Sequence, residues 1–149
     1  MDTSNTSTTL AGEYLSFRLG AKEYGINIFS VQEIRSYERP TRIESAPDGL
    51  VGVLSLRGVI VPIVDMRVVC KVTPEYNIFT VTVIANVDGR ILGLVVDSVC
   101  DVLELTARLI QPPPQDSSDP LVVGVASVPP ERSIALLDVS SLQAFCEGF

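Results

Sequence analysis

Short apolar runs divided by glycine dominate the chain from Tyr14 onward. Runs of this length, rich in Val and Ile and bounded by turn residues, are typical of strands. Apolar and polar residues alternate over 14–19 and 79–83, as expected for strands with one buried face. Asn86-Val87-Asp88-Gly89 and Leu56-Arg57-Gly58 each divide two apolar runs and predict hairpin turns. The pattern predicts a mainly β protein.

Helices are expected to be short, because Val, Ile, Gly and Pro interrupt every helical pattern. The best two begin after Asp65 and Asp138, since an aspartate at that position can accept from the free N–H groups of a first turn. Residues 1–12 are rich in Ser and Thr and are predicted to form a flexible tail. The remainder, 13–149, is predicted to be one domain, with a proline-rich surface loop starting at Gln111.

An internal repeat divides this domain. GINIFSVQEIR (25–35) aligns with GLVVDSVCDVL (93–103), and the alignment continues in the same order through VGV at 51–53 and 123–125. PIVDM and ALLDV then align Asp65 with Asp138. Chance similarity between strand sequences is the alternative, but the preserved order favours duplication. Two small β subdomains should then pack on an apolar seam, with a groove between them.

Composition removes several classes of function. The chain has 11 Lys+Arg against 18 Asp+Glu, no His and three Cys. Without His, the commonest general base and metal ligand are lacking, so most hydrolase mechanisms lose their main residue. No metal or cofactor motif occurs, so we expect no metal and no cofactor. The acidic balance disfavours nucleic acid as a partner. No apolar run is long enough to span a membrane, so we expect a cytoplasmic protein with no membrane insertion.

After these exclusions, Arg57 is the remaining candidate for a functional residue. It lies at a predicted hairpin tip between two strongly apolar strands, where it is either an ordinary exposed turn residue or an anchor for a partner protein. Pro62 follows in the second strand and cannot donate to a sheet, which predicts an edge strand or a bulge.

The chain closely resembles the CheW family of bacterial chemotaxis coupling proteins. The resemblance rests on F-x-L-G, E-Y-G-I, V-Q-E-I-R, T-R-I, L-R-G-V-I-V-P-I-V-D and G-x-V-V-D-x-V-x-D-V-L, which run from about Tyr14 to Leu142. It implies two intertwined, five-stranded β-barrels with an apolar core between them. Ser55, where the family commonly has Asn, and the region from Pro112 to Arg132 depart from the usual pattern.

The same resemblance implies a function. Family members are non-catalytic adaptors that link transmembrane chemoreceptors to the histidine kinase CheA, by binding its regulatory domain and the receptor's cytoplasmic tip. Arg57 matches the family's interaction arginine, and further motif positions at or near partner surfaces are Ile28, Val31, Glu33, Gly52 and Gly58. A paralogue serving another array, such as one for pilus-based twitching, is the alternative. A small-molecule sensor or enzyme using the groove is disfavoured, because no polar cluster converges there.

Overall fold

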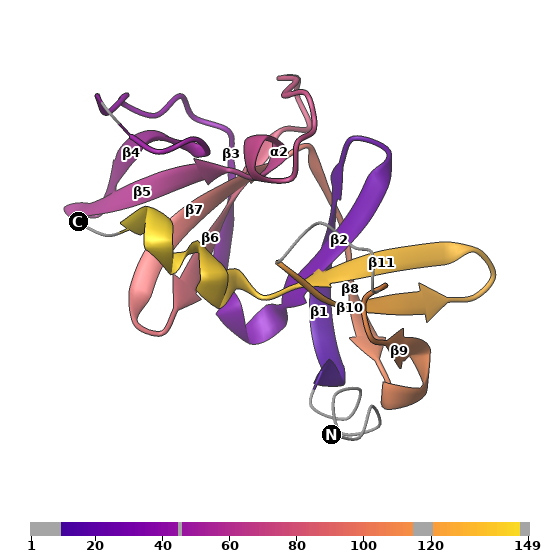
Figure 1. Cartoon of the computed structure of the whole chain (residues 1–149). Coiled ribbons are helices and arrows are strands. Elements are labelled where there is room, and N and C mark those ends of the chain that lie inside the picture. The colour runs from indigo at the N-terminus through magenta and orange to yellow at the C-terminus, as the bar shows by residue number, and fades with distance from the viewer. Residues whose placement is uncertain (1–9, 45, 115–120, 147–149) are drawn as a thin grey trace.

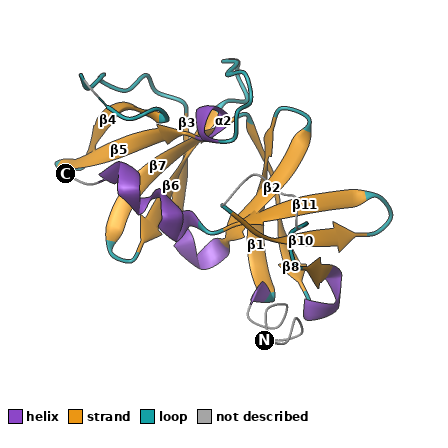
Figure 2. Cartoon of the chain, in the orientation of Figure 1, coloured by secondary structure: helices purple, strands orange, loops and turns teal. Residues whose placement is uncertain are grey.

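Two curved β-sheets make up most of the molecule, as the computed structural model shows (Figures 1 and 2). The structure describes residues 10–44, 46–114 and 121–146. Within these residues the strands are β1 (Gly12–Leu19), β2 (Lys22–Asn27), β3 (Val31–Ser36), β4 (Leu50–Leu56), β5 (Val59–Asp65), β6 (Val81–Val87), β7 (Arg90–Val96), β8 (Ser98–Leu105), β9 (Ile110–Gln111), β10 (Val122–Val128) and β11 (Arg132–Leu137). The helical turns are η1 (Ile28–Ser30), α2 (Met66–Val69), η2 (Ala107–Leu109) and η3 (Val139–Cys146).

Each sheet contains strands from both halves of the chain. One has five strands in the order β3-β6-β7-β5-β4, and the other has six in the order β8-β1-β2-β11-β10-β9. The chain crosses from the six-stranded to the five-stranded sheet at η1, and returns between β7 and β8. The prediction of two small β subdomains packed together is therefore confirmed, with the two-residue β9 added to one of them.

The two sheets are related by the repeat found in the sequence. Replacing each strand of the five-stranded sheet by its repeat partner gives β8-β1-β2-β11-β10, which is the order of the other sheet. The parallel pairs Ile63 with Gly93 and Leu136 with Gly25 are equivalent in the repeat. The β-bulge before Gly52 has its counterpart before Gly124. Agreement in strand order, register and bulge position supports duplication over chance.

Three apolar clusters match this arrangement. The largest lies between the sheets and combines Phe17 and Ile26 from one with Val83 and Leu94 from the other. Each sheet also curves around a smaller cluster of its own. The cluster of the six-stranded sheet includes Ile134, and the cluster of the five-stranded sheet includes Leu54 of β4. Central strands thus bury both faces, which explains their nearly continuous apolar sequence. The predicted apolar seam is present.

Both predicted helix starts are confirmed. The Asp65 side chain accepts from the backbone N–H of Arg67 at the start of α2, and Asp138 accepts from Ser140 N at 3.1 Å before η3. Residues 1–9 of the tail predicted over 1–12 lie outside the described residues. Gly12 pairs with Leu105, and Leu10 packs against the core, so residues 10 and 12 of the predicted tail belong to the folded domain.

Pro62 does not mark an edge strand, and the bulge of this strand pair lies between Leu50 and Gly52 on β4 rather than at Pro62. Its strand, β5, lies between β4 and β7, and β4 is the edge. Pro62 is tolerated because the pairing of β5 with β7 begins only at Ile63. No carbonyl of β7 therefore lacks a hydrogen bond because proline has no N–H.

A fully buried arginine joins the two sheets. Arg67 in α2 is 0% exposed, and its guanidinium bonds Asp65 at 2.6 Å and Asp97 at 2.8 Å. Asp97 lies where the chain crosses back between the sheets, and its second oxygen accepts from Gly20 N in the β1–β2 turn at 2.7 Å. Burial alone would lower the pKa of Arg67, but hydrogen bonds and the charge of Asp65 raise it, so the side chain stays charged.

We expect Arg67→Met to destabilise the protein by about 3 kcal/mol or more, because it leaves Asp65 buried without its cation. The free energy of unfolding from urea titration measures this. The control is Arg108→Met on η2, an exposed position where a change within about 0.5 kcal/mol is expected. Equal stability of Arg67→Met and wild type would show that the buried charge contributes nothing.

Candidate protein interface

Arg57 forms the tip of the β4–β5 hairpin, as predicted. Arg57 and Gly58 have φ values of 51° and 81°, which fits the type I′ turn that two-residue hairpins prefer. Gly58 suits this backbone and has open space where a Cβ would lie. The Arg57 side chain is 68% exposed and donates from Nη2 to Glu33 Oε2 at 3.0 Å. The turn therefore presents a guanidinium that has one carboxylate partner and remains accessible.

Glu33 lies on β3, at the opposite edge of the same sheet. A bulge between Val31 and Glu33 shifts the β3–β6 register there, and bulges commonly redirect a side chain. The ion pair with Arg57 connects the two edges and so closes the barrel. The other oxygen, Oε1, is buried and accepts no hydrogen bond from any described residue, while Arg35 Nη1 lies 3.7 Å away.

Apolar side chains surround this ion pair. A hollow of about 230 Å³ beside it is lined by Gln32, Glu33, Leu56, Arg57, Val59, Val61, Ile84 and Ile91. Val59 and Ile60 are more than half exposed, and Ile34 on β3 is 46% exposed. An arginine among accessible apolar groups is the composition found at the centres of protein interfaces. The arrangement suits protein contact.

The other predicted site residues lie elsewhere. Ile28 begins η1 and Val31 directly follows it, and both are partly buried against the core between the sheets. Between them Phe29 is 91% exposed, which no sequence pattern indicated. Gly52 is buried, and a Cβ there would lie 2.2 Å from Thr41 O, so its direct role is close backbone packing.

An equivalent closure occurs in the six-stranded sheet, where the sequence did not indicate it. Arg132 at the start of β11 pairs with Glu23 on β2 and with Asp101 at 2.9 Å. Asp101 is the repeat equivalent of Glu33 and also accepts from Ser16 Oγ at 2.8 Å. Hydrogen bonds from Arg132 and Ser16 lower the pKa of Asp101. Burial raises the pKa of Glu23, but the same two donors and the charge of Arg132 lower it overall.

Neither a metal centre nor a membrane span emerges from the described residues. They contain no group of three or more His, Cys, Asp or Glu placed to hold a metal ion. Nor do they include a helix with the length and hydrophobicity to cross a membrane.

Comparison with known proteins identifies the relatives. The family model described as CheW-like domain matches residues 13–145. A chemotaxis protein CheW from Klebsiella aerogenes is 44% identical over 138 residues, covering 90% of this chain and 82% of that protein. A probable chemotaxis protein CheW from Rhizobium etli is 34% identical, covering 87% and 86% of the two chains.

A solved structure agrees with these sequence matches. The crystal structure of the scaffolding protein TtCheW from Thermoanaerobacter tengcongensis superposes with a TM-score of 0.79 at 26% identity, covering 87% of this chain and 90% of that one. The predicted resemblance and the predicted non-enzymatic class are confirmed by these matches. The chemotaxis names do not favour the alternative of an array for twitching.

We expect Arg132→Gln to lower the stability at neutral pH by about 1 kcal/mol, because partly exposed ion pairs contribute little more. The folded pKa values of Glu23 and Asp101 are lowered, so their contribution is present above the usual carboxyl pKa of about 4. It is lost as pH falls through the folded values. The difference in Tm between variant and wild type should therefore narrow below about pH 4.

Thermal unfolding followed by circular dichroism between pH 7 and pH 3 measures this narrowing. Arg108→Gln is the control, since its exposed side chain forms no ion pair with a described residue. A difference that stays constant down to pH 3 would mean that Arg132 acts through packing rather than charge.

Proposed function

The chain belongs to the CheW family, and we propose that it couples transmembrane chemoreceptors to a CheA-type histidine kinase. Membership of this family makes it a chemotaxis scaffold protein rather than an enzyme. The proposed partners are the regulatory domain of the kinase and the cytoplasmic tip of the receptor. The proposed location is the cytoplasm, beside the membrane-bound receptor array.

The observation that carries this proposal is the closure of the five-stranded barrel by Arg57 and Glu33. A guanidinium has five N–H donors, and Glu33 takes one of those of Arg57, at 3.0 Å. Val59, which follows the Arg57-Gly58 turn, is exposed and lines the same hollow as Arg57, and the exposed Ile60 comes next in β5. We assign this face to the kinase regulatory domain, because accessible arginine and apolar groups together suit a specific contact.

The receptor tip is assigned to the junction of the two sheets. Ile28 and Val31 reach the core there, and the exposed ring of Phe29 stands between them. On another part of the junction, a hollow of about 410 Å³ is bounded by Gly20 from the β1–β2 turn, Phe79 and Val99. The exposed rings of Phe29 and Phe79, with partly buried aliphatic groups beside the junction, support docking of a helical hairpin.

Arg57→Glu is expected to weaken partner binding about fivefold or more, because it reverses the charge of the exposed guanidinium and repels Glu33. The fold should persist, since the turn is exposed. Co-sedimentation with a cognate receptor fragment and its kinase measures binding, and kinase autophosphorylation measures coupling. Arg108→Glu is the matched control on the other sheet. Full binding by Arg57→Glu would contradict the assignment.

A charge-swapped variant, Glu33→Arg with Arg57→Glu, separates contact from closure. This variant can restore the ion pair between β3 and the β4–β5 turn, but it moves the guanidinium from the turn to β3. If Arg57 contacts the partner directly, this variant should bind as weakly as Arg57→Glu. Recovery of binding by the swap would show that Arg57 acts only by closing the barrel.

A further inference from the structure

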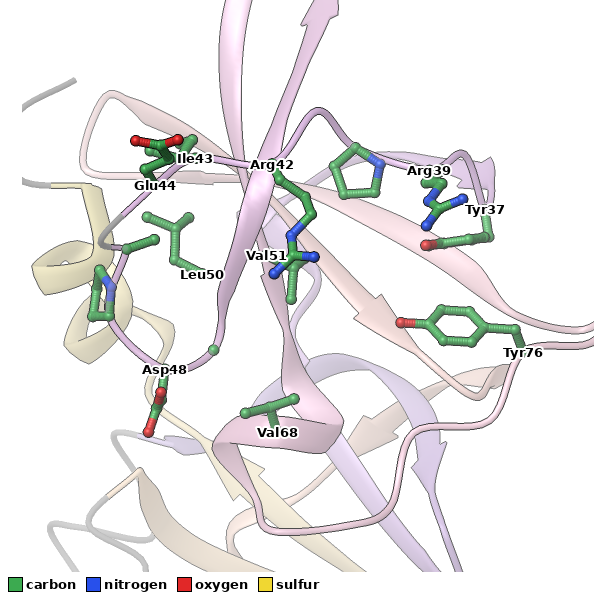
Figure 3. Close-up of a pocket in the computed structure, with 14 residues that line it drawn as sticks. Tyr37, Arg39, Arg42, Ile43, Glu44, Asp48, Leu50, Val51, Val68 and Tyr76 are labelled. Atoms are coloured by element: carbon green, nitrogen blue, oxygen red, sulfur yellow. The ribbon is translucent and has the colours of Figure 1, made fainter.

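A third and larger hollow lies along the segment between β3 and β4 (Figure 3). Its volume is about 850 Å³, and it is bounded by that segment, the start of β4, α2 and the loop that carries Tyr76. Arg57 is at the far end of β4, so this hollow is separate from the interface proposed above. None of the six residues predicted from the sequence lines it.

Two arginines in this hollow lack acidic partners. Arg39 and Arg42 are both exposed, and neither forms an ion pair or hydrogen bond with another described residue. Arg35, Arg57, Arg67 and Arg132 all bind carboxylates. In a chain of net charge −7, these two unpaired cations place positive charge along one part of the hollow, which Glu44 and Asp48 also line.

The wall beside these arginines is rigidly built. The rings of Tyr37 and Tyr76 lie 4.8 Å apart, and the Tyr76 hydroxyl donates to Asp65 at 3.3 Å. The buried Arg67 guanidinium stacks on the Tyr76 ring, 4.8 Å from its centroid. Aromatic walls fixed in this way lose little conformational entropy when a partner binds.

The backbone that carries Arg42 is fixed as well. Thr41 pairs with Val53 of β4 through two hydrogen bonds of 2.9 and 2.8 Å. Gly52 permits this close approach, because any side chain there would collide with the Thr41 carbonyl. The arginine is therefore held at the hollow by a strand edge rather than by a free loop.

Charge is divided along the hollow. Figure 3 shows Arg39 with Tyr37 and Tyr76 toward one end, Arg42 between, and Glu44 and Asp48 toward the other. Carboxylates of an occupant are attracted to the arginine end and repelled from the Glu44 end. A bound segment with acidic residues at one end only would complement the arginine end of the hollow and avoid repulsion at the Glu44 end.

We propose that this hollow binds an extended acidic segment of a protein partner, with its carboxylates on Arg39 and Arg42. The planar guanidinium fork matches carboxylate geometry, and the tyrosine rings provide apolar contact for the intervening side chains. The site adds a third protein contact to the two of the coupling role and does not depend on them. It is tested on the isolated full chain without receptor or kinase.

The probe is an acetylated, amidated peptide of sequence Glu-Leu-Glu-Leu-Gly-Lys, titrated into the isotope-labelled protein and followed by amide chemical shifts. Shifts are expected in 37–44 and around Tyr76. Arg39→Gln with Arg42→Gln should weaken binding about fivefold, because two accessible ion pairs are lost. Lys22→Gln with Arg108→Gln, two exposed cations on the other sheet, is the matched control and should bind as wild type.

Three results would overturn the proposal. The first is equal binding of the neutral peptide Gln-Leu-Gln-Leu-Gly-Gln, since carboxylates would then be irrelevant. The second is saturation of the same amides by inorganic phosphate at the same concentrations, which would identify a small-anion site. The third is the same shifts on raising protein concentration without peptide, which would identify a second copy of the chain as occupant.

Discussion

The arrangement of the two sheets depends on one buried cation. Arg67 is 0% exposed and bonds Asp65 at the end of β5 and Asp97 at the crossing back to the other sheet. Through Asp97 it also reaches Gly20 in the β1–β2 turn, and through its Nη1 it holds the carbonyl of Glu75 at 2.8 Å. Apolar contact between sheets is not directional, whereas these bonds fix angle and position. The same guanidinium positions the loop that carries Tyr76, so it also fixes the tyrosine wall of the hollow along the β3–β4 segment.

Strand exchange makes the two barrels inseparable. Because β3 pairs with β6 and β8 pairs with β1, neither half of the chain can complete a sheet alone. Each half is also too small to bury much apolar surface by itself. Folding therefore creates both barrels and the seam together, which places the crossing points, η1 and Asp97, at the centre of the molecule. Residues at a crossing contact both sheets, so they suit a partner that must recognise the assembled protein.

The sequence was sufficient for the strands, the repeat, the capping aspartates and the exposed turn at Arg57, because each depends on neighbouring residues or on a repeated pattern. It did not reveal the ion pairs that close the structure. Arg67 and Asp97 are 30 positions apart, and Arg132 and Glu23 are 109 apart, so only the fold brings them together. The Val-Asp-Met-Arg-Val-Val sequence contained a signal, an arginine inside an apolar run next to a cap, that could have suggested a buried pair. The prediction of an edge strand from Pro62 was wrong, because a proline is also tolerated in an inner strand at a position where pairing with one neighbour has not begun.

The two barrels have similar closures, in which the carboxylates Glu33 and Asp101 are equivalent in the repeat but the arginines occupy different positions of their hairpins. The difference between the closures explains why one suits a partner better. Arg132 is 34% exposed and its guanidinium is shared by two carboxylates, so its donors are largely satisfied within the chain. Arg57 is 68% exposed and has one carboxylate partner, Glu33, which itself keeps one oxygen without a hydrogen bond from a described residue. A partner gains most from polar groups that are already positioned but not fully used. The five-stranded barrel therefore has unsatisfied hydrogen-bonding groups at its closure. The corresponding groups of the six-stranded barrel bond within the chain and stabilise the fold. Because of this asymmetry, the two barrels of a duplicated fold present different surfaces.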